Sequence, residues 1–219
     1  MKKYLFTTLM MVCGIIAQAQ DYSFPKNEDG KYEFSEVINN NLSKSTLFAN
    51  STSWAMEYFK EEGFQNVVQF CSETDGRIII KNYGVVLNDI EIKKGKSHFG
   101  KENVNYTLTI DCKENKYRYI INDITIKKLS YSSLYGNDME WDMTHERHLE
   151  NITAYNHEKD SLNSLVPNLK GKKLTKIQNQ ISEVEDKIKG EKEMYNDEFA
   201  IFERLINSLK KKMLANTDF

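Results

Sequence analysis

The sequence lacks the signatures of several common functional sites. It contains no Gly-x-Ser-x-Gly nucleophile elbow and no glycine-rich phosphate-binding loop. It also has no excess of basic residues, which argues against a nucleic-acid binder. These absences favour a protein that is not an enzyme, binds no nucleic acid and uses no cofactor.

Long hydrophobic segments are scarce, and the one candidate lies at the start of the chain. Lys2 and Lys3 precede an apolar stretch over residues 4 to 17, and Ala17-Gln18-Ala19 fits the pattern that signal peptidases cut. A membrane span needs about 20 apolar residues, so this run is too short to be one. We therefore predict a signal peptide over residues 1–20, an exported protein that is periplasmic or secreted, and no membrane span in the mature chain.

The mature chain would be acidic and poor in cysteine. Removal of residues 1–20 leaves 28 Lys and Arg against 32 Asp and Glu, a formal charge of −4. Only Cys71 and Cys112 remain, and both fall in predicted strands. In an oxidising compartment they are a possible disulfide, and the alternative is two unrelated core residues.

Residues 21–129 show the pattern of an α+β domain. Ser43 is placed to cap a helix over about residues 44 to 62, and Glu73-Thr74-Asp75-Gly76 predicts a hairpin turn. Residues 93 to 102 are typical of a solvated loop. Alternation of apolar and polar residues predicts strands over 31–38, 67–71, 77–83, 105–111 and 117–127. The order predicts an antiparallel sheet backed on one face by helices.

Several short motifs of this region share an order and spacing with a known family. They are Phe24-Pro25, Asp29-Gly30-Lys31, Ser35-Glu36-Val37, Leu42-Ser43-Lys44 with Leu47 and Trp54, Lys116-Tyr117-Arg118-Tyr119, and Asn122-Asp123-Ile124. Over about residues 24 to 128 the chain resembles a domain-of-unknown-function family of exported bacterial proteins with a TATA-binding-protein-like (TBP-like) fold. The resemblance implies a curved antiparallel sheet with a helix on its convex side. It implies no activity.

The C-terminal part changes character twice. Residues 130–168 are predicted to be a polar connecting region with one short helix near residues 143 to 156. Residues 169–219 are predicted to be a helical extension with two amphipathic, coiled-coil-like segments separated near Gly190. One helix over 172 to 214 would be about 65 Å long, so we expect it to bend near Gly190, fold back or project. Its apolar stripe, residues 174–213, either covers the sheet or binds a protein partner or a second copy.

One group of histidines and carboxylates is a candidate metal site, made of His145, His148 and His157 with Glu146 and Glu150. A zinc-protease helix needs His-Glu-x-x-His, and here His148 follows His145 after only three positions. We therefore predict no metal site and no catalytic residue. The sequence favours an exported, non-enzymatic binding or assembly module of the bacterial cell envelope. The alternative is a secreted hydrolase or metal-binding enzyme that uses the His145/His148 region.

Overall fold

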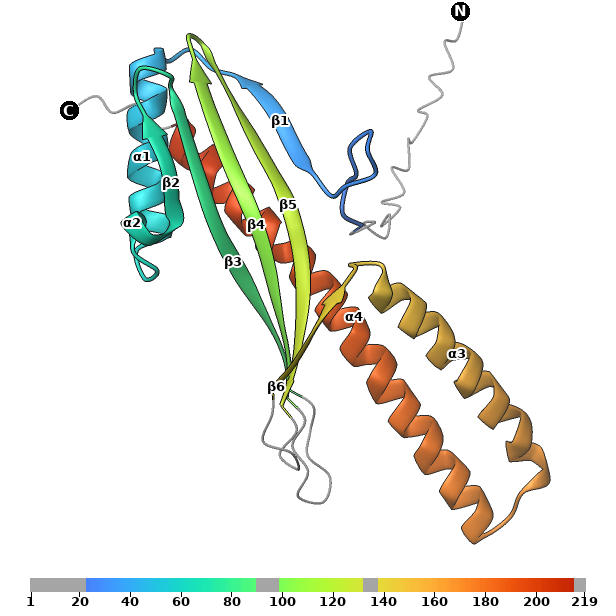
Figure 1. Cartoon of the computed structure of the whole chain (residues 1–219). Coiled ribbons are helices and arrows are strands. Elements are labelled where there is room, and N and C mark those ends of the chain that lie inside the picture. Colours follow the sequence, from blue (N-terminus) through green and yellow to red (C-terminus); the bar gives the residue numbers. More distant parts are fainter. Residues whose placement is uncertain (1–22, 90–98, 132–137, 215–219) are drawn as a thin grey trace, which may run out of the picture.

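The computed structural model describes residues 23–89, 99–131 and 138–214, which form one curved antiparallel sheet and a set of helices (Figure 1). The predicted signal peptide lies outside these residues. The strands are β1 (Phe34–Asn39), β2 (Val68–Ser72), β3 (Arg77–Asp89), β4 (Phe99–Lys113), β5 (Lys116–Tyr131) and β6 (Asp138–Met143). The helices are α1 (Lys44–Tyr58), α2 (Phe64–Val67), α3 (Arg147–Leu165), the 3-10 turn η1 (Val166–Asn168) and α4 (Lys172–Met213). The predicted α+β class is confirmed.

The sheet has the strand order β1-β5-β4-β3-β2, and β6 pairs with β5 beyond the end of β1. The predicted hairpins are present, and Gly76 in the β2–β3 turn has a φ of 67°, as expected for a glycine there. The predicted loop over residues 93 to 102 is corrected at its C-terminal end, because β4 begins at Phe99, and residues 93–98 lie outside the described residues. Polar residues such as Glu102 can occupy a strand when they pair with charges on the neighbouring one.

A bulge in β5 changes which of its residues face the core. Tyr117, Tyr119 and Ile121 are buried, but the next buried residues are Ile124 and Ile126. The change of phase coincides with a register shift between β4 and β5 and with a φ of 51° at Asp123. The extra residue therefore keeps apolar side chains on the core face as far as Ile126.

Helices α1 and α4 cover one face of the sheet and enclose the core with it. Ser43 caps α1 by accepting a 3.2 Å hydrogen bond from the Thr46 N–H, as the sequence predicted. Trp54 Nε1 of α1 donates to Ser208 Oγ of α4 at 3.0 Å. Gly84 of β3 lets α4 approach closely, because a Cβ there would lie 2.6 Å from Ile201 Cδ1. The C-terminal half of the predicted apolar stripe thus packs on the sheet of its own chain.

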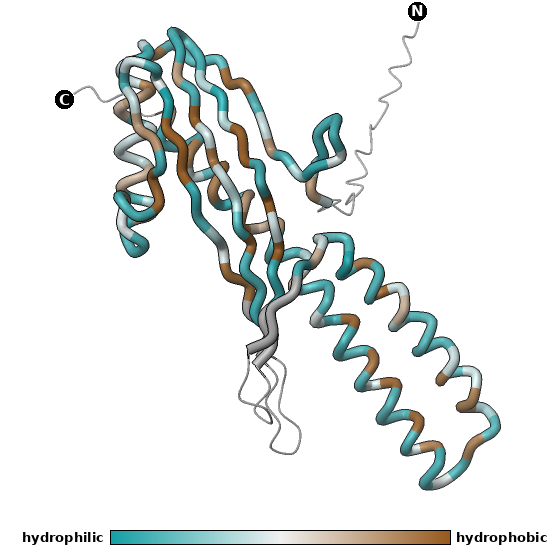
Figure 2. Tube along the Cα trace, in the orientation of Figure 1, coloured by the Kyte–Doolittle hydropathy of each residue, from teal (hydrophilic) through white to brown (hydrophobic). Residues whose placement is uncertain are grey.

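The N-terminal half of α4 continues past the sheet and pairs with α3 (Figure 1). We call this pair, residues 147–190, the helical arm. α4 is one helix of 42 residues, about 63 Å long, with no interruption at Gly190. Of the three expected arrangements it takes the projecting one. Apolar residues recur along α4 within the arm (Figure 2), and Val184 and Ile188 are buried there.

The prediction for residues 130–168 is corrected in part, because the helix expected near residues 143 to 156 is the longer α3 and the region also contains the strand β6. α3 is 19 residues long and polar, and only His148 in it is fully buried. Its polar composition reflects contact mainly with α4, so most of its surface is solvated. Among the described residues, no helix is both long and apolar enough to cross a membrane.

The face of the sheet opposite the helices has an ion network that makes stability sensitive to acid. Asp111 accepts hydrogen bonds from Arg77 Nε at 2.5 Å and Arg118 Nη2 at 2.6 Å. Burial raises the pKa of Asp111, but the two arginines outweigh burial and hold that pKa below its ordinary value of 3.8. Because the pKa is lower in the folded state, this stabilisation is present above the unfolded pKa and is lost as the pH falls through the folded pKa.

We expect Asp111→Asn to lower the free energy of unfolding near neutral pH by about 0.5 to 1 kcal/mol, the usual size for an exposed pair. The difference from the unmodified chain should shrink in acid below the folded pKa. Urea titrations at the two pH values measure it, with the exposed Glu73→Gln as the control. An equal loss at both pH values would contradict this account of the network.

Candidate functional site: a buried histidine and glutamate cluster

Five ionisable side chains meet where the helical arm joins the sheet. We call them the His–Glu cluster, and they are Glu102, His145, His148, Glu191 and Glu198. The side chains of four of them are fully buried, and that of Glu191 is 12% exposed. Burial of so many ionisable groups costs free energy unless opposite charges pair. The cluster is therefore the strongest candidate for a functional site among the described residues.

The sheet contributes Glu102 from the start of β4. Glu102 lies on the same face of the strand as Val104 and Tyr106, which are core residues. Lys128 of β5 is its cross-strand partner, and Lys128 Nζ lies 3.5 Å from Glu102 Oε1. The position of Glu102 therefore follows from strand alternation once β4 extends to Phe99.

The long helix contributes the other two glutamates, both from its apolar stripe. Val184 and Ile188 are followed by Glu191, Tyr195, Glu198 and Phe202 at alternating spacings of four and three residues. The predicted break in phase near Gly190 is therefore corrected, since the stripe runs through the junction with two glutamates at core positions. A glutamate on such a stripe is the signal that reveals this site from the sequence.

His148, in the first turn of α3, is the centre of the cluster. Its Nδ1 lies 2.6 Å from Glu191 Oε2, a short, charge-assisted hydrogen bond. Its Nε2 lies 3.3 Å from Glu102 Oε2 and 3.4 Å from Glu198 Oε1. These two distances are longer than is usual for a charge-assisted hydrogen bond, about 2.7–2.9 Å. One imidazole thus faces three carboxylates from two elements.

His145 lies in the turn after β6 and holds Glu198 from the other side. Its Nδ1 is 2.5 Å from Glu198 Oε2. The imidazole is stacked between the rings of Phe24 and Tyr195, at centroid distances of 3.9 and 4.0 Å. This packing fixes the orientation of the ring and so the position of the Glu198 carboxylate.

The carboxylates control the protonation of His148. Burial alone lowers the pKa of His148, but its interactions with Glu102, Glu191 and Glu198 outweigh burial and raise that pKa to about 11. Burial likewise raises the pKa of Glu198, and hydrogen bonds with His145 and His148 reverse this, so that its pKa lies below the ordinary value. In the absence of other cations, His148 is therefore an imidazolium among carboxylates.

This arrangement leaves the buried carboxylate of Glu102 without a hydrogen bond. Both of its oxygens lie within ion-pair distance of a cation, yet neither accepts a hydrogen bond, and the side chain is fully buried. One ligand atom from each of Glu102, His148 and Glu198 lies within 4.8 Å of the other two. Imidazole nitrogen with carboxylate oxygen is a donor set that suits zinc and related divalent ions.

Comparison with known proteins identifies the sheet region. Residues 34–127 match the family model of DUF4468, a domain of unknown function with a TBP-like fold. The match confirms the predicted domain-of-unknown-function family and its TBP-like fold for this segment. No functionally curated protein matches the chain.

Two solved structures match most of the chain. A DUF4468 family protein from Bacteroides ovatus ATCC 8483 has 15% sequence identity and a TM-score of 0.51, covering 90% of this chain and 93% of that one. A TBP-like protein from Parabacteroides distasonis ATCC 8503 has 17% identity and a TM-score of 0.49, covering 86% and 96%. The likeness to the first structure concerns the fold alone, and it extends beyond the DUF4468 segment.

Most of the His–Glu cluster lies outside the DUF4468 segment, since only Glu102 belongs to it. Of the residues singled out from the sequence, only His145 and His148 enter the cluster. Glu146 instead accepts a hydrogen bond from the Tyr32 hydroxyl and forms a 3.0 Å ion pair with Lys26. Glu150 forms an ion pair with Arg147. Glu102, Glu191 and Glu198 were not predicted.

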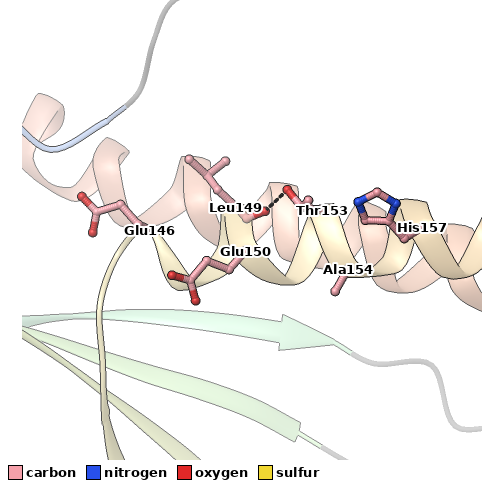
Figure 3. Close-up of a pocket in the computed structure, with 6 residues that line it drawn as sticks. All are labelled: Glu146, Leu149, Glu150, Thr153, Ala154 and His157. Carbon is pink, nitrogen blue, oxygen red and sulfur yellow. Dashed lines mark hydrogen bonds between the residues drawn. The ribbon is translucent and has the colours of Figure 1, made fainter.

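His157 is exposed on α3 and lines a shallow pocket on the surface of this helix (Figure 3). The pocket residues are Glu146, Leu149, Glu150, Thr153, Ala154 and His157. Leu149 is 43% exposed there. The pocket is an open depression of a helix surface and does not include the buried imidazoles.

Cys71 and Cys112 are both free thiols, the first exposed on β2 and the second buried on β4. β3 lies between their two strands. Two interstrand spacings amount to about 10 Å, beyond the reach of a disulfide. Burial raises the pKa of the Cys112 thiol to about 11, which makes it a poor nucleophile.

Proposed function

We propose that the protein is an exported, non-enzymatic binding module of the bacterial cell envelope whose contact element is the tip of the helical arm. The arm extends away from the sheet, and we call its far end, residues 161–182, the tip (Figure 1). A rigid pair of helices held at one end by the core is suited to reach a partner.

The tip has a concentrated positive charge on an otherwise acidic chain. Residues 161–182 contain four lysines and no acidic residue. Lys170, Lys172, Lys173 and Lys176 are all exposed. The first turn of α4 contains no acidic side chain, although acidic residues would be stabilising there. Lysines in place of acidic residues make this end of α4 less stable. That cost in helix stability supports a role of the lysines in binding an anionic partner.

Apolar residues beside the lysines favour an anionic lipid surface as that partner. Leu165 is 47% exposed, and Val166 and Leu169 are half-buried on either side of Pro167. Each lysine near an anionic bilayer contributes about 1 kcal/mol of attraction, and a few apolar side chains can enter the headgroup region. The tip therefore combines the two features that peripheral membrane contact needs.

Burial of the His–Glu cluster supports the non-enzymatic part of the proposal. A hydrolase needs its catalytic groups to reach a substrate, and His145 and His148 are both fully buried among the described residues. The alternative of a secreted hydrolase that uses these histidines receives no support from this geometry.

Cosedimentation of the mature chain with vesicles tests the proposal. We expect binding to vesicles of phosphatidylglycerol mixed with phosphatidylcholine, weakening with added salt, and no binding to phosphatidylcholine alone. Reversal of the four tip lysines to glutamate should reduce binding by at least about tenfold.

The matched control reverses four exposed lysines outside the arm, which are Lys60, Lys113, Lys116 and Lys211. This variant has the same net charge as the tip variant and should keep most of the binding. Equal loss in both variants would mean that net charge alone matters. Absence of binding by the unmodified chain would overturn the lipid proposal, and light scattering would then show whether a second copy is the partner.

A further inference from the structure

The His–Glu cluster has more buried negative charge than its fixed cation balances. The carboxylates of Glu102, Glu191 and Glu198 face His148. Among the described residues, Lys128 is the one lysine within ion-pair distance of any of these carboxylates. Metal coordination would displace the Nε2 proton of His148, and the three carboxylates would then outnumber the lysine by two, which matches the charge of a divalent ion. Buried charges of this kind are paired or coordinate a metal ion.

The two ring nitrogens of His148 have different partners and therefore different roles. Nδ1 makes a short bond of 2.6 Å to Glu191, and Asn151 Nδ2 in turn donates to the other oxygen of Glu191 at 3.1 Å. A metal-bound histidine has this arrangement, in which a carboxylate accepts from the distal ring nitrogen and fixes the tautomer. Nε2 is then the nitrogen that points at Glu102 and Glu198.

The spacing around Nε2 agrees with a tetrahedral ion. Zinc lies about 2.0–2.1 Å from nitrogen and oxygen ligands, which places two ligands of a tetrahedron about 3.3–3.4 Å apart. Nε2 is 3.3 Å from Glu102 Oε2 and 3.4 Å from Glu198 Oε1. These separations are long for charge-assisted hydrogen bonds and fit two edges of such a site.

Glu102 gives the independent indication of a ligand. It is fully buried, its carboxylate is directed into the cluster, and neither oxygen accepts a hydrogen bond. An ionised carboxylate in this condition is costly, whereas metal coordination would satisfy it.

We propose that the His–Glu cluster binds one divalent cation of the zinc class through His148 Nε2 and the carboxylates of Glu102 and Glu198. Glu191 orients His148, and His145 orients Glu198 through its second oxygen. The ion joins β4, α3 and α4, so its role is structural and fixes the arm to the sheet. This site is independent of the proposed lipid contact, which uses the opposite end of the arm.

Metal content of the full mature chain tests the site. The protein is produced without a histidine tag, unfolded and refolded with a chelator, dialysed against zinc, and analysed by mass spectrometry. We expect about one zinc ion per chain and a rise in Tm of about 5 °C or more at saturating zinc. Cobalt in place of zinc should give the visible absorption of a tetrahedral site.

Two variants separate ligation from folding. Glu102→Gln keeps the shape of the side chain and should lower zinc content at least tenfold while the far-ultraviolet circular dichroism stays unchanged. His157→Ala, on the exposed side of the same helix, should bind as the unmodified chain does. If the unmodified chain binds no stoichiometric zinc and its Tm is the same with zinc and with chelator, the cluster is an ion-pair network only and the proposal is overturned.

Discussion

Phe202→Ala is expected to destabilise the protein by about 3 to 5 kcal/mol, the usual cost of removing a buried aromatic ring. Phe202 is fully buried on α4, where the long helix crosses the sheet. Its ring stacks on Phe34 at 4.9 Å between centroids and meets Phe24 and Tyr106 edge to face at 5.3 and 5.5 Å. The loss includes both the apolar contact and these ring pairs.

Chemical denaturation monitored by circular dichroism measures this loss. Phe70→Ala is the matched control, because the Phe70 side chain on edge strand β2 is 41% exposed, and we expect it to cost less than about 1 kcal/mol. Similar stabilities for Phe202→Ala and Phe70→Ala would show that α4 does not contribute to the core as described.

His148→Ala is expected to cost a similar amount, about 3 to 5 kcal/mol in metal-free buffer, for a different reason. The substitution removes the imidazolium that faces three carboxylates and so leaves this buried negative charge with one cation fewer. The same substitution at the exposed His157 should change stability by less than about 0.5 kcal/mol. Denaturant titration of the two variants measures the difference.

A second set of substitutions distinguishes charge from packing at this position. If uncompensated charge causes the loss, adding Glu102→Gln and Glu191→Gln to His148→Ala should recover part of the stability, since neutral amides need no counter-ion. If the loss comes only from the cavity left by the imidazole, the added substitutions will not help. Failure to recover would contradict the electrostatic account of the cluster.

Much of the sheet could be predicted from local patterns. Alternation along residues 105–111 and 117–127 depends only on which side chains face the core, and the burial of Tyr117 and Tyr119 follows from it. Ser43 fixed the start of α1, because its hydroxyl satisfies a backbone group within the same turn. These features need no information from distant parts of the chain.

The His–Glu cluster could not be predicted in the same way. His145 and His148 are surrounded by polar residues in sequence, and their burial depends on Glu102 and Glu198, which are more than 40 residues away. A local motif test fails because the ligand atoms come from separate elements. The useful signal was the pair Glu191 and Glu198, which occupies core positions of the helical stripe.

At Gly190 a local signal was given too much weight, since two separate helical segments were predicted and α4 is continuous there. A glycine inside a helix costs about 1 kcal/mol relative to alanine, which is enough to suggest a break but too little to force one. Packing of Val184 and Ile188 on one side and of Tyr195 and Phe202 on the other outweighs this cost. Helix continuity was therefore decided by tertiary contacts on both sides of the glycine.

The central claim is that the buried cluster fixes the helical arm to the sheet, and amide hydrogen exchange of the unmodified chain and of His148→Ala tests it most directly. We predict that exchange in residues 147–165 becomes faster in the variant by a factor about ten or more times greater than in β3, β4 and β5, because local release of the arm adds to the general loss of stability. Unchanged exchange in α3 would contradict the claim.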